Sequence, residues 1–169
     1  KLEEKVMLQT IIKTTVSAVL LATAITSFAG DLHVSKEVTV NASPDTTWKM
    51  IGDFNHLDVW HPVVVGSVLT HGKTSDTRLL TLGNGATMNE EQLSRNDAER
   101  SYTYAILTSP LPVADYVSTI SVTPAADGKS TVTWSSSFDA NGASDEEAVN
   151  AITGIYDAGM SSLDKHFNK

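Results

Sequence analysis

The feature that most constrains the fold is a run of strand-like segments joined by short turns. Two turns stand out, Asn84-Gly85 and Asp127-Gly128, because Asn, Asp and Gly tolerate the positive φ that a tight hairpin needs. Successive hairpins build an antiparallel sheet, so the middle of the chain predicts one. Its expected strands are residues 63–71, 77–82, 86–95, 101–107, 114–123 and 130–138.

The segments on either side complete the architecture. Residues 33–40 alternate in period two and predict a strand, and Ser43-Pro44 then marks a helix start. Near the C-terminus, Ser144 and Glu147 form a capping box, which predicts a long helix. Its apolar stripe at spacings of three and four predicts a core-facing side: Val149, Ile152, Tyr156, Met160, Leu163 and Phe167. We therefore expect an α+β fold in which a curved antiparallel β-sheet wraps around a long C-terminal helix and leaves an internal cavity.

The first 29 residues differ from the rest and are expected to form an N-terminal extension to a single domain of residues 30–169. Residues Met7 to Ala29 are typical of a signal peptide that is cleaved before Gly30. They contain the basic Lys13, then an apolar run, and small residues at the end. The apolar run is shorter than the roughly 20 residues of a membrane span. We expect a periplasmic or secreted protein with no stable membrane insertion after cleavage. The alternative is a helix that packs on the domain.

Composition excludes several function classes. The formal net charge of −8 gives no electrostatic footprint for nucleic acid or an anionic membrane. The absence of cysteine removes disulfides and thiolate catalysis. His56, His61 and His71 lack a metal-binding spacing and are expected to be loop residues, so neither a metal nor a cofactor is predicted.

A charged pair in "RLLTLGNGATMNEEQL" is the candidate site. If Asn84 and Gly85 are a two-residue hairpin loop, Arg78 lies directly opposite Glu91, on one sheet face with Leu80, while Glu90 lies on the other face. The alternative is an exposed ion pair, worth about 0–1 kcal/mol and without function. A bulge in a longer loop would also break the pairing.

Several segments in a fixed order resemble a known superfamily. They are "WKMIGDFNHLDVWHPVV", "TRLLTLGNG", "EEQLSRNDAERSYTYAI", "SPLPVADYVSTISV" and "STVTWSSSF". Over about residues 33 to 168 the chain resembles the polyketide cyclase/dehydrase-like branch of the START/Bet v 1 (SRPBCC) superfamily. The resemblance implies the helix-grip fold with an internal ligand cavity.

The resemblance also implies site residues. Similarity to the lachrymatory factor synthase type makes Arg78 and Glu91 the expected catalytic residues, with Tyr104 and Tyr116 as cavity tyrosines. Asn89 is expected to support the charged pair. Trp60 is expected either to line the cavity entrance and contact ligand or to cap the core. Similarity to the periplasmic MxaD type, an accessory protein of methanol oxidation, implies export.

Three functions follow as hypotheses. The favoured one is an exported protein that binds a small hydrophobic or amphipathic molecule. The first alternative is a cyclase, isomerase or dehydratase in which Glu91 is the general acid/base and Arg78 stabilises an anionic intermediate. The second alternative is an accessory protein that docks to a periplasmic redox protein through its acidic surface.

Overall fold

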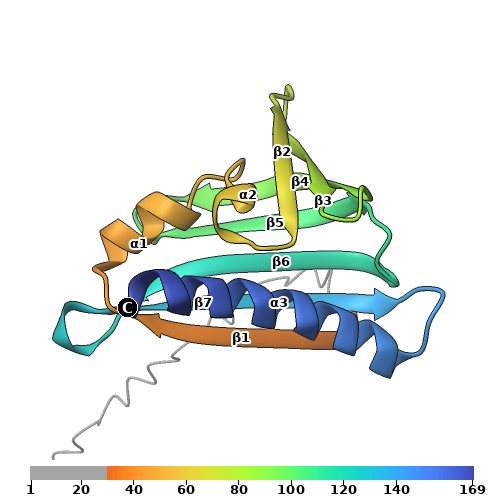
Figure 1. The fold of residues 1–169 in the computed structure, drawn as a ribbon. Helices are drawn as coiled ribbons and strands as arrows, with labels where there is room; N and C mark the ends of the chain where they lie inside the picture. Colours follow the sequence, from red (N-terminus) through yellow and green to blue (C-terminus); the bar gives the residue numbers. More distant parts are fainter. Residues whose placement is uncertain (1–29) are drawn as a thin grey trace, which may run out of the picture.

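The part of the chain that the structure describes, residues 30–169, is built on one seven-stranded antiparallel sheet in the computed structural model. The strands lie in the order β1-β7-β6-β5-β4-β3-β2 (Figure 1). Their bounds are Leu32–Val40 (β1), Val64–Thr70 (β2), Thr77–Leu82 (β3), Thr87–Asn96 (β4), Ser101–Thr108 (β5), Val113–Pro124 (β6) and Ser130–Ala140 (β7). All six strand pairs are antiparallel, as the successive hairpins predicted.

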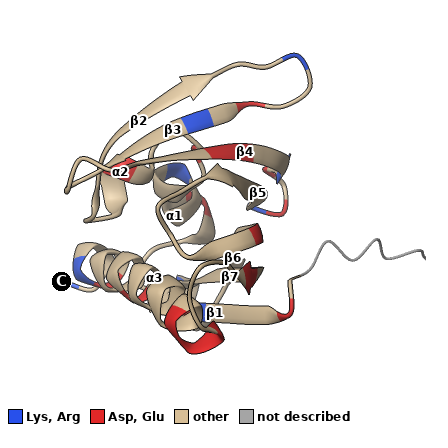
Figure 2. Cartoon of the chain, turned by 90° about the vertical axis from the view of Figure 1, so that its right-hand side faces the viewer, with Lys and Arg blue, Asp and Glu red and all other residues tan. Residues whose placement is uncertain are grey.

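The C-terminal helix α3, Asp145–Phe167, is the element that the sheet wraps. Figure 2 shows the sheet curving from β2 round to β1, with α3 inside the curve along β7 and β1. The predicted capping box is present: the Ser144 hydroxyl accepts from the Glu147 N–H, and the Glu147 carboxylate accepts from the Ser144 N–H. The buried face of α3 consists of Ala148, Ile152, Tyr156, Gly159, Met160 and Leu163. The helix-grip prediction is therefore confirmed.

Two short helices join β1 to β2. Helix α1, Pro44–Ile51, begins as predicted, with Pro44 in the first turn and the Ser43 hydroxyl accepting from the Thr46 N–H. Helix α2, Leu57–Trp60, is a single turn that ends at His61. This link brings Phe54, Trp60 and His61 into the core between the sheet and α3. A further one-turn 3₁₀ helix, Ala126–Gly128, forms the β6–β7 turn, where Asp127 and Gly128 have the expected positive φ of 58° and 73°.

The register of the β3–β4 hairpin differs from the prediction. The Leu82 N–H donates to the Ala86 carbonyl, so the loop consists of three residues, Gly83 to Gly85, instead of two. Gly85 has a φ of +84°, the left-handed residue that a three-residue hairpin loop requires. Arg78 therefore pairs with Glu90, and the predicted pairing of Arg78 with Glu91 is wrong. Because side chains alternate between faces, this shift of one residue exchanges the two glutamates between the inside and the outside of the sheet.

None of the described helices combines the length and the apolar character needed to cross a bilayer. The signal peptide predicted from Met7 to Ala29 lies outside the described residues.

The conformation of Gly85 generates a stability prediction. Gly85→Ala should lower the free energy of unfolding by about 1 kcal/mol, because an L side chain is strained at a φ of +84°. Gly154→Ala is the matched control: Gly154 is an exposed residue of α3 with open space around it, and alanine there should raise the stability by about 0.5–1 kcal/mol. Urea unfolding of the two variants checks the opposite signs. Two changes of the same sign would contradict the assigned hairpin geometry.

Candidate functional site

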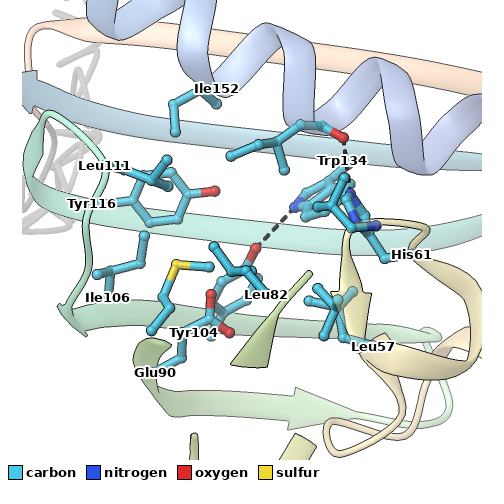
Figure 3. Close-up of a pocket in the computed structure, with 14 residues that line it drawn as sticks. Leu57, His61, Leu82, Glu90, Tyr104, Ile106, Leu111, Tyr116, Trp134 and Ile152 are labelled. Atoms are coloured by element: carbon cyan, nitrogen blue, oxygen red, sulfur yellow. Dashed lines mark hydrogen bonds between the residues drawn. The ribbon is translucent and has the colours of Figure 1, made fainter. Parts of the chain in front are cut away.

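A cavity of about 170 Å³ lies between the inner face of the sheet, the α2–β2 link and α3 (Figure 3). The side chains around it are predominantly apolar, and the partly exposed ones, including Val63 and Leu82, mark its rim. The lining residues are Leu57, His61, Val63, Val64, Leu82, Met88, Glu90, Tyr104, Ile106, Leu111, Tyr116, Trp134, Ile152 and Ile155.

Glu90 is the charged residue of this lining, and Arg78 is its partner. The Arg78 Nε donates to Glu90 Oε2 at 2.6 Å, and both side chains are almost fully buried, at 0% and 3% exposure. A second guanidinium nitrogen of Arg78 donates to the Phe54 carbonyl. The guanidinium carbon lies 4.1 Å from the centre of the Phe54 ring and 5.2 Å from that of Tyr104, so two aromatic faces add cation–π stabilisation. Arg78 itself does not line the cavity; it supports Glu90 from behind.

Burial dominates the electrostatics of this pair. Desolvation raises the pKa of Glu90 above its ordinary value, and the adjacent Arg78 offsets only part of that effect. Desolvation is the largest effect on Arg78 and lowers its pKa, but Glu90, Tyr102 and Tyr104 together outweigh it and raise the pKa overall, so the guanidinium stays charged. The result is a carboxyl group with a raised pKa that faces an apolar cavity.

A chain of hydrogen bonds crosses the cavity wall and joins the sheet to α3. The Ser118 hydroxyl donates to the Ser135 carbonyl, so its oxygen must accept from the Tyr156 hydroxyl, at 2.9 Å. Tyr156 therefore accepts from the Tyr116 hydroxyl, at 2.6 Å. Burial raises the pKa of Tyr116 well above the ordinary tyrosine value and that of Tyr156 to about 12, so both hydroxyls stay protonated. Each proton in this chain has a defined acceptor.

Trp134 connects this chain to Tyr104. Its indole N–H lies 3.0 Å from the Ser118 oxygen and 3.1 Å from the Tyr104 oxygen, and it donates to both. Burial also raises the pKa of Tyr104 well above the ordinary value, so Tyr104 keeps its proton.

His61 fastens the α2–β2 link to α3. Its Nε2–H donates to the Ile155 carbonyl at 3.0 Å, and its Nδ1 accepts from the Val63 N–H at 3.4 Å, an arrangement that requires the neutral ring. Burial lowers the pKa of His61, and the positive charge of Arg78 lowers it further, against the opposing effect of the Ile155 bond. The close approach depends on Gly159, where a Cβ would lie 2.9 Å from the His61 ring and from that of Trp134.

The structure places the residues predicted for the site in three different environments. Tyr104 and Tyr116 line the cavity. Trp60 is buried but does not line it; its ring packs 5.5 Å from that of Trp134, which supports the core-capping alternative. Asn89 pairs with Leu79, which is 45% exposed, so it lies on the outer face and does not support the charged pair.

Glu91 also lies outside the cavity. It pairs with Thr77, and its carboxylate accepts from the Ser75 hydroxyl. Glu90, not the predicted Glu91, is therefore the glutamate that pairs with Arg78 and lines the cavity. The assignment of Glu90 to the outer face was wrong. Sequence reasoning also missed the cavity-facing position of His61, expected to be a loop residue, and did not assign Trp134 to the cavity. The signal that could have found Glu90 is Gly85, which can take the left-handed third position of a three-residue loop.

Within residues 30–169 no three His, Asp or Glu side chains converge to hold a metal ion. Whether the cavity residues act in binding or catalysis stays a prediction.

Comparisons with known proteins agree with this architecture. A protein-family model described as "Polyketide cyclase / dehydrase and lipid transport" matches residues 31–168. The solved structure of XoxI from Bacillus cereus is 38% identical, with a TM-score of 0.77 over 81% of this chain and 96% of that one. An uncharacterised protein from Bacillus thuringiensis is 37% identical, with a TM-score of 0.77 over 82% of this chain and 100% of its own.

A more distant structure shares the fold alone. The aromatase/cyclase Zhui from Streptomyces is 17% identical, with a TM-score of 0.64 over 78% of this chain and 90% of that one. No curated protein matches the chain. The resemblance on which the sequence analysis relied is confirmed at the level of the superfamily.

The buried pair generates a prediction about stability. Arg78→Met should lower the free energy of unfolding by about 3–5 kcal/mol, because it leaves the Glu90 carboxylate buried without its partner. Lys36→Met is the control: Lys36 and Asp157 form an ion pair of 2.9 Å whose side chains are 35% and 56% exposed, and its loss should cost about 0–1 kcal/mol. Guanidinium chloride unfolding measures both, and equal losses would be inconsistent with a buried pair.

The neutral state of His61 generates a pH prediction. Folding lowers the pKa of His61, so the neutral ring stabilises the folded state. This contribution is fully present above the ordinary histidine pKa of about 6.5, and it is lost as the pH falls through the pKa of the folded state. The stability advantage of the wild type over His61→Gln should therefore be constant above about pH 6.5 and shrink below it. Urea unfolding of both proteins from about pH 7.5 to about pH 5 tests this. Parallel pH curves would show that His61 does not titrate differently in the folded state.

Proposed function

The chain belongs to the family described as polyketide cyclase/dehydrase and lipid transport, and from this premise we propose that it binds a small, mostly apolar molecule in the cavity beneath α3. The observation that carries the proposal is the cavity itself, whose walls are predominantly apolar and whose charged lining residue is the single Glu90. An apolar pocket with few convergent polar groups is the usual form of a small-molecule site.

The volume supports a ligand of about one ring. At about 170 Å³ the cavity is smaller than the roughly 300–1,000 Å³ of sites for drug-sized ligands. It is close to an engineered cavity of about 150 Å³ that binds benzene. A longer amphipathic molecule would place one ring-sized group inside and extend past the rim at Val63 and Leu82.

Binding is favoured over the enzymatic alternative by the position of the charges. The enzymatic alternative gives Arg78 the role of stabilising an anionic intermediate, for which its guanidinium would have to face the reacting atoms. Arg78 is instead bonded to Glu90 and to the Phe54 carbonyl and lies between two aromatic rings, away from the cavity. The docking alternative rests on the net charge of −8 and on the resemblance to the MxaD-type accessory proteins, not on a contact surface that the described residues define.

Native mass spectrometry of the protein purified from its host tests the proposal. The wild type should carry a small-molecule adduct, and Ile106→Phe should lose it, because the larger ring occupies the cavity that Ile106 lines. Val68→Phe is the matched control, since Val68 is 64% exposed on the outside of the sheet, and it should keep the adduct. Equal adduct levels in the two variants would contradict binding at this site. The same spectrum tests our proposal of export, which predicts a mature chain that starts at Gly30.

A further inference from the structure

We propose that the cavity selects uncharged molecules carrying a hydroxyl group and rejects anions, because its free hydrogen-bonding groups are one oxygen of Glu90 and the proton of Tyr104. This inference rests on the proposed function and names the class of ligand that the site would take.

Glu90 offers an acceptor that the protein leaves unused. Its Oε2 accepts from Arg78, whereas within residues 30–169 no group donates to Oε1. The residue is 2% exposed, so bulk water does not solvate that oxygen well. A poorly solvated carboxylate oxygen without a donor is costly, and a ligand that brings a donor removes that cost.

The other donors that line the cavity are already committed. Tyr116 donates to Tyr156, Tyr156 to Ser118 and Ser118 to the Ser135 carbonyl. The His61 Nε2–H is held by Ile155. The Trp134 indole N–H is shared by Ser118 and Tyr104. None of these groups is free to turn towards Glu90 without breaking its own bond.

Tyr104 is the exception. Its oxygen accepts from Trp134, and in the described part of the chain its hydroxyl proton has no acceptor. Tyr104 and Glu90 come from the adjacent strands β5 and β4 and line the same cavity (Figure 3). A ligand hydroxyl is the group that matches both, since it donates one hydrogen bond and accepts others.

Anions are disfavoured by the same arrangement. A ligand carboxylate would meet the Glu90 carboxylate in a low-dielectric cavity, where like charges repel strongly. Arg78, the cation that would compensate, is 0% exposed and does not line the cavity, so its unpartnered Nη2 is not presented to a ligand there. The Arg78–Glu90 pair is neutral as a unit, so an ammonium ligand would also add an uncompensated buried charge.

A set of ring compounds tests the inference on the wild-type protein after bound material has been removed. Toluene has nearly the same shape as phenol but no hydrogen-bond donor. Phenol should bind at least about tenfold more tightly, because its hydroxyl donates to the charged Glu90 carboxylate and such a bond contributes at least a factor of about ten in affinity. Benzoate should bind at least about tenfold more weakly than phenol. Isothermal titration calorimetry or ligand-observed NMR gives the dissociation constants.

The outcomes separate the two proposals. If toluene or benzoate binds as tightly as phenol, the selectivity proposed here is overturned while the cavity remains a binding site. If none of the three compounds binds, both this inference and the proposed function fail.

Two glutamine variants at adjacent positions locate the selectivity. In Glu90→Gln the side-chain carbonyl still accepts the hydrogen bond from Arg78, so the NH₂ group faces the cavity and offers a donor in place of an acceptor. The preference for phenol over toluene should therefore fall. The affinity for cyclohexanone, which only accepts, should rise about tenfold relative to that for cyclohexanol. Glu91→Gln is the matched control; it lies on the outer face and should leave all four affinities unchanged. An unchanged preference in Glu90→Gln, or a changed one in Glu91→Gln, overturns the assignment. If Glu90→Gln does not fold, the wild-type series decides.

Discussion

The buried pair of Arg78 and Glu90 sets the conditions for everything around it. Neither charge would be tolerated alone at this depth, so each requires the other, and their contact requires that β3 and β4 pair in one register. That register depends on a loop of three residues closed by Gly85 in the left-handed conformation. A local backbone preference at the tip of a hairpin therefore determines which glutamate faces the cavity.

The remaining polar groups of the cavity wall are arranged so that they satisfy one another. Trp134 and Tyr156 stack with ring centres 4.2 Å apart and planes within 17° of parallel, which holds α3 against β7. Both residues also bond to Ser118 of β6, so three elements share one network. Because a fully satisfied network resists rearrangement, the second Glu90 oxygen and the Tyr104 proton stand out as the polar features that the proposed ligand would meet.

The sequence predicted the elements better than it predicted their faces. The Ser144–Glu147 capping box and the Ser43-Pro44 helix start are local signals, read from residues that contact each other within a few positions, and both are present. The hairpin at Asn84-Gly85 is also present, but the dipeptide does not decide whether Gly83 joins the loop. An error of one residue there exchanged Glu90 for Glu91.

Other site residues depend on contacts that are distant in the sequence. His61 looks like any loop histidine until α3 supplies the Ile155 carbonyl, 94 positions away. Its burial also needs the absence of a side chain at Gly159, which carries no signal in the sequence of the loop. Tyr104 and Tyr116 were predicted through the superfamily resemblance; the strand pattern gave the strands but not which residues turn towards the helix.

The cavity is itself an argument for ligand binding. A cavity of about 170 Å³ leaves its apolar lining without the packing contacts that a filled core would supply. A buried carboxylate, that of Glu90, stands at the cavity wall, where a purely structural core would place an apolar group. A small hydroxyl-bearing molecule removes both penalties at once, since it fills the volume and donates to the carboxylate, and through mass action it would stabilise the folded protein in proportion to its affinity.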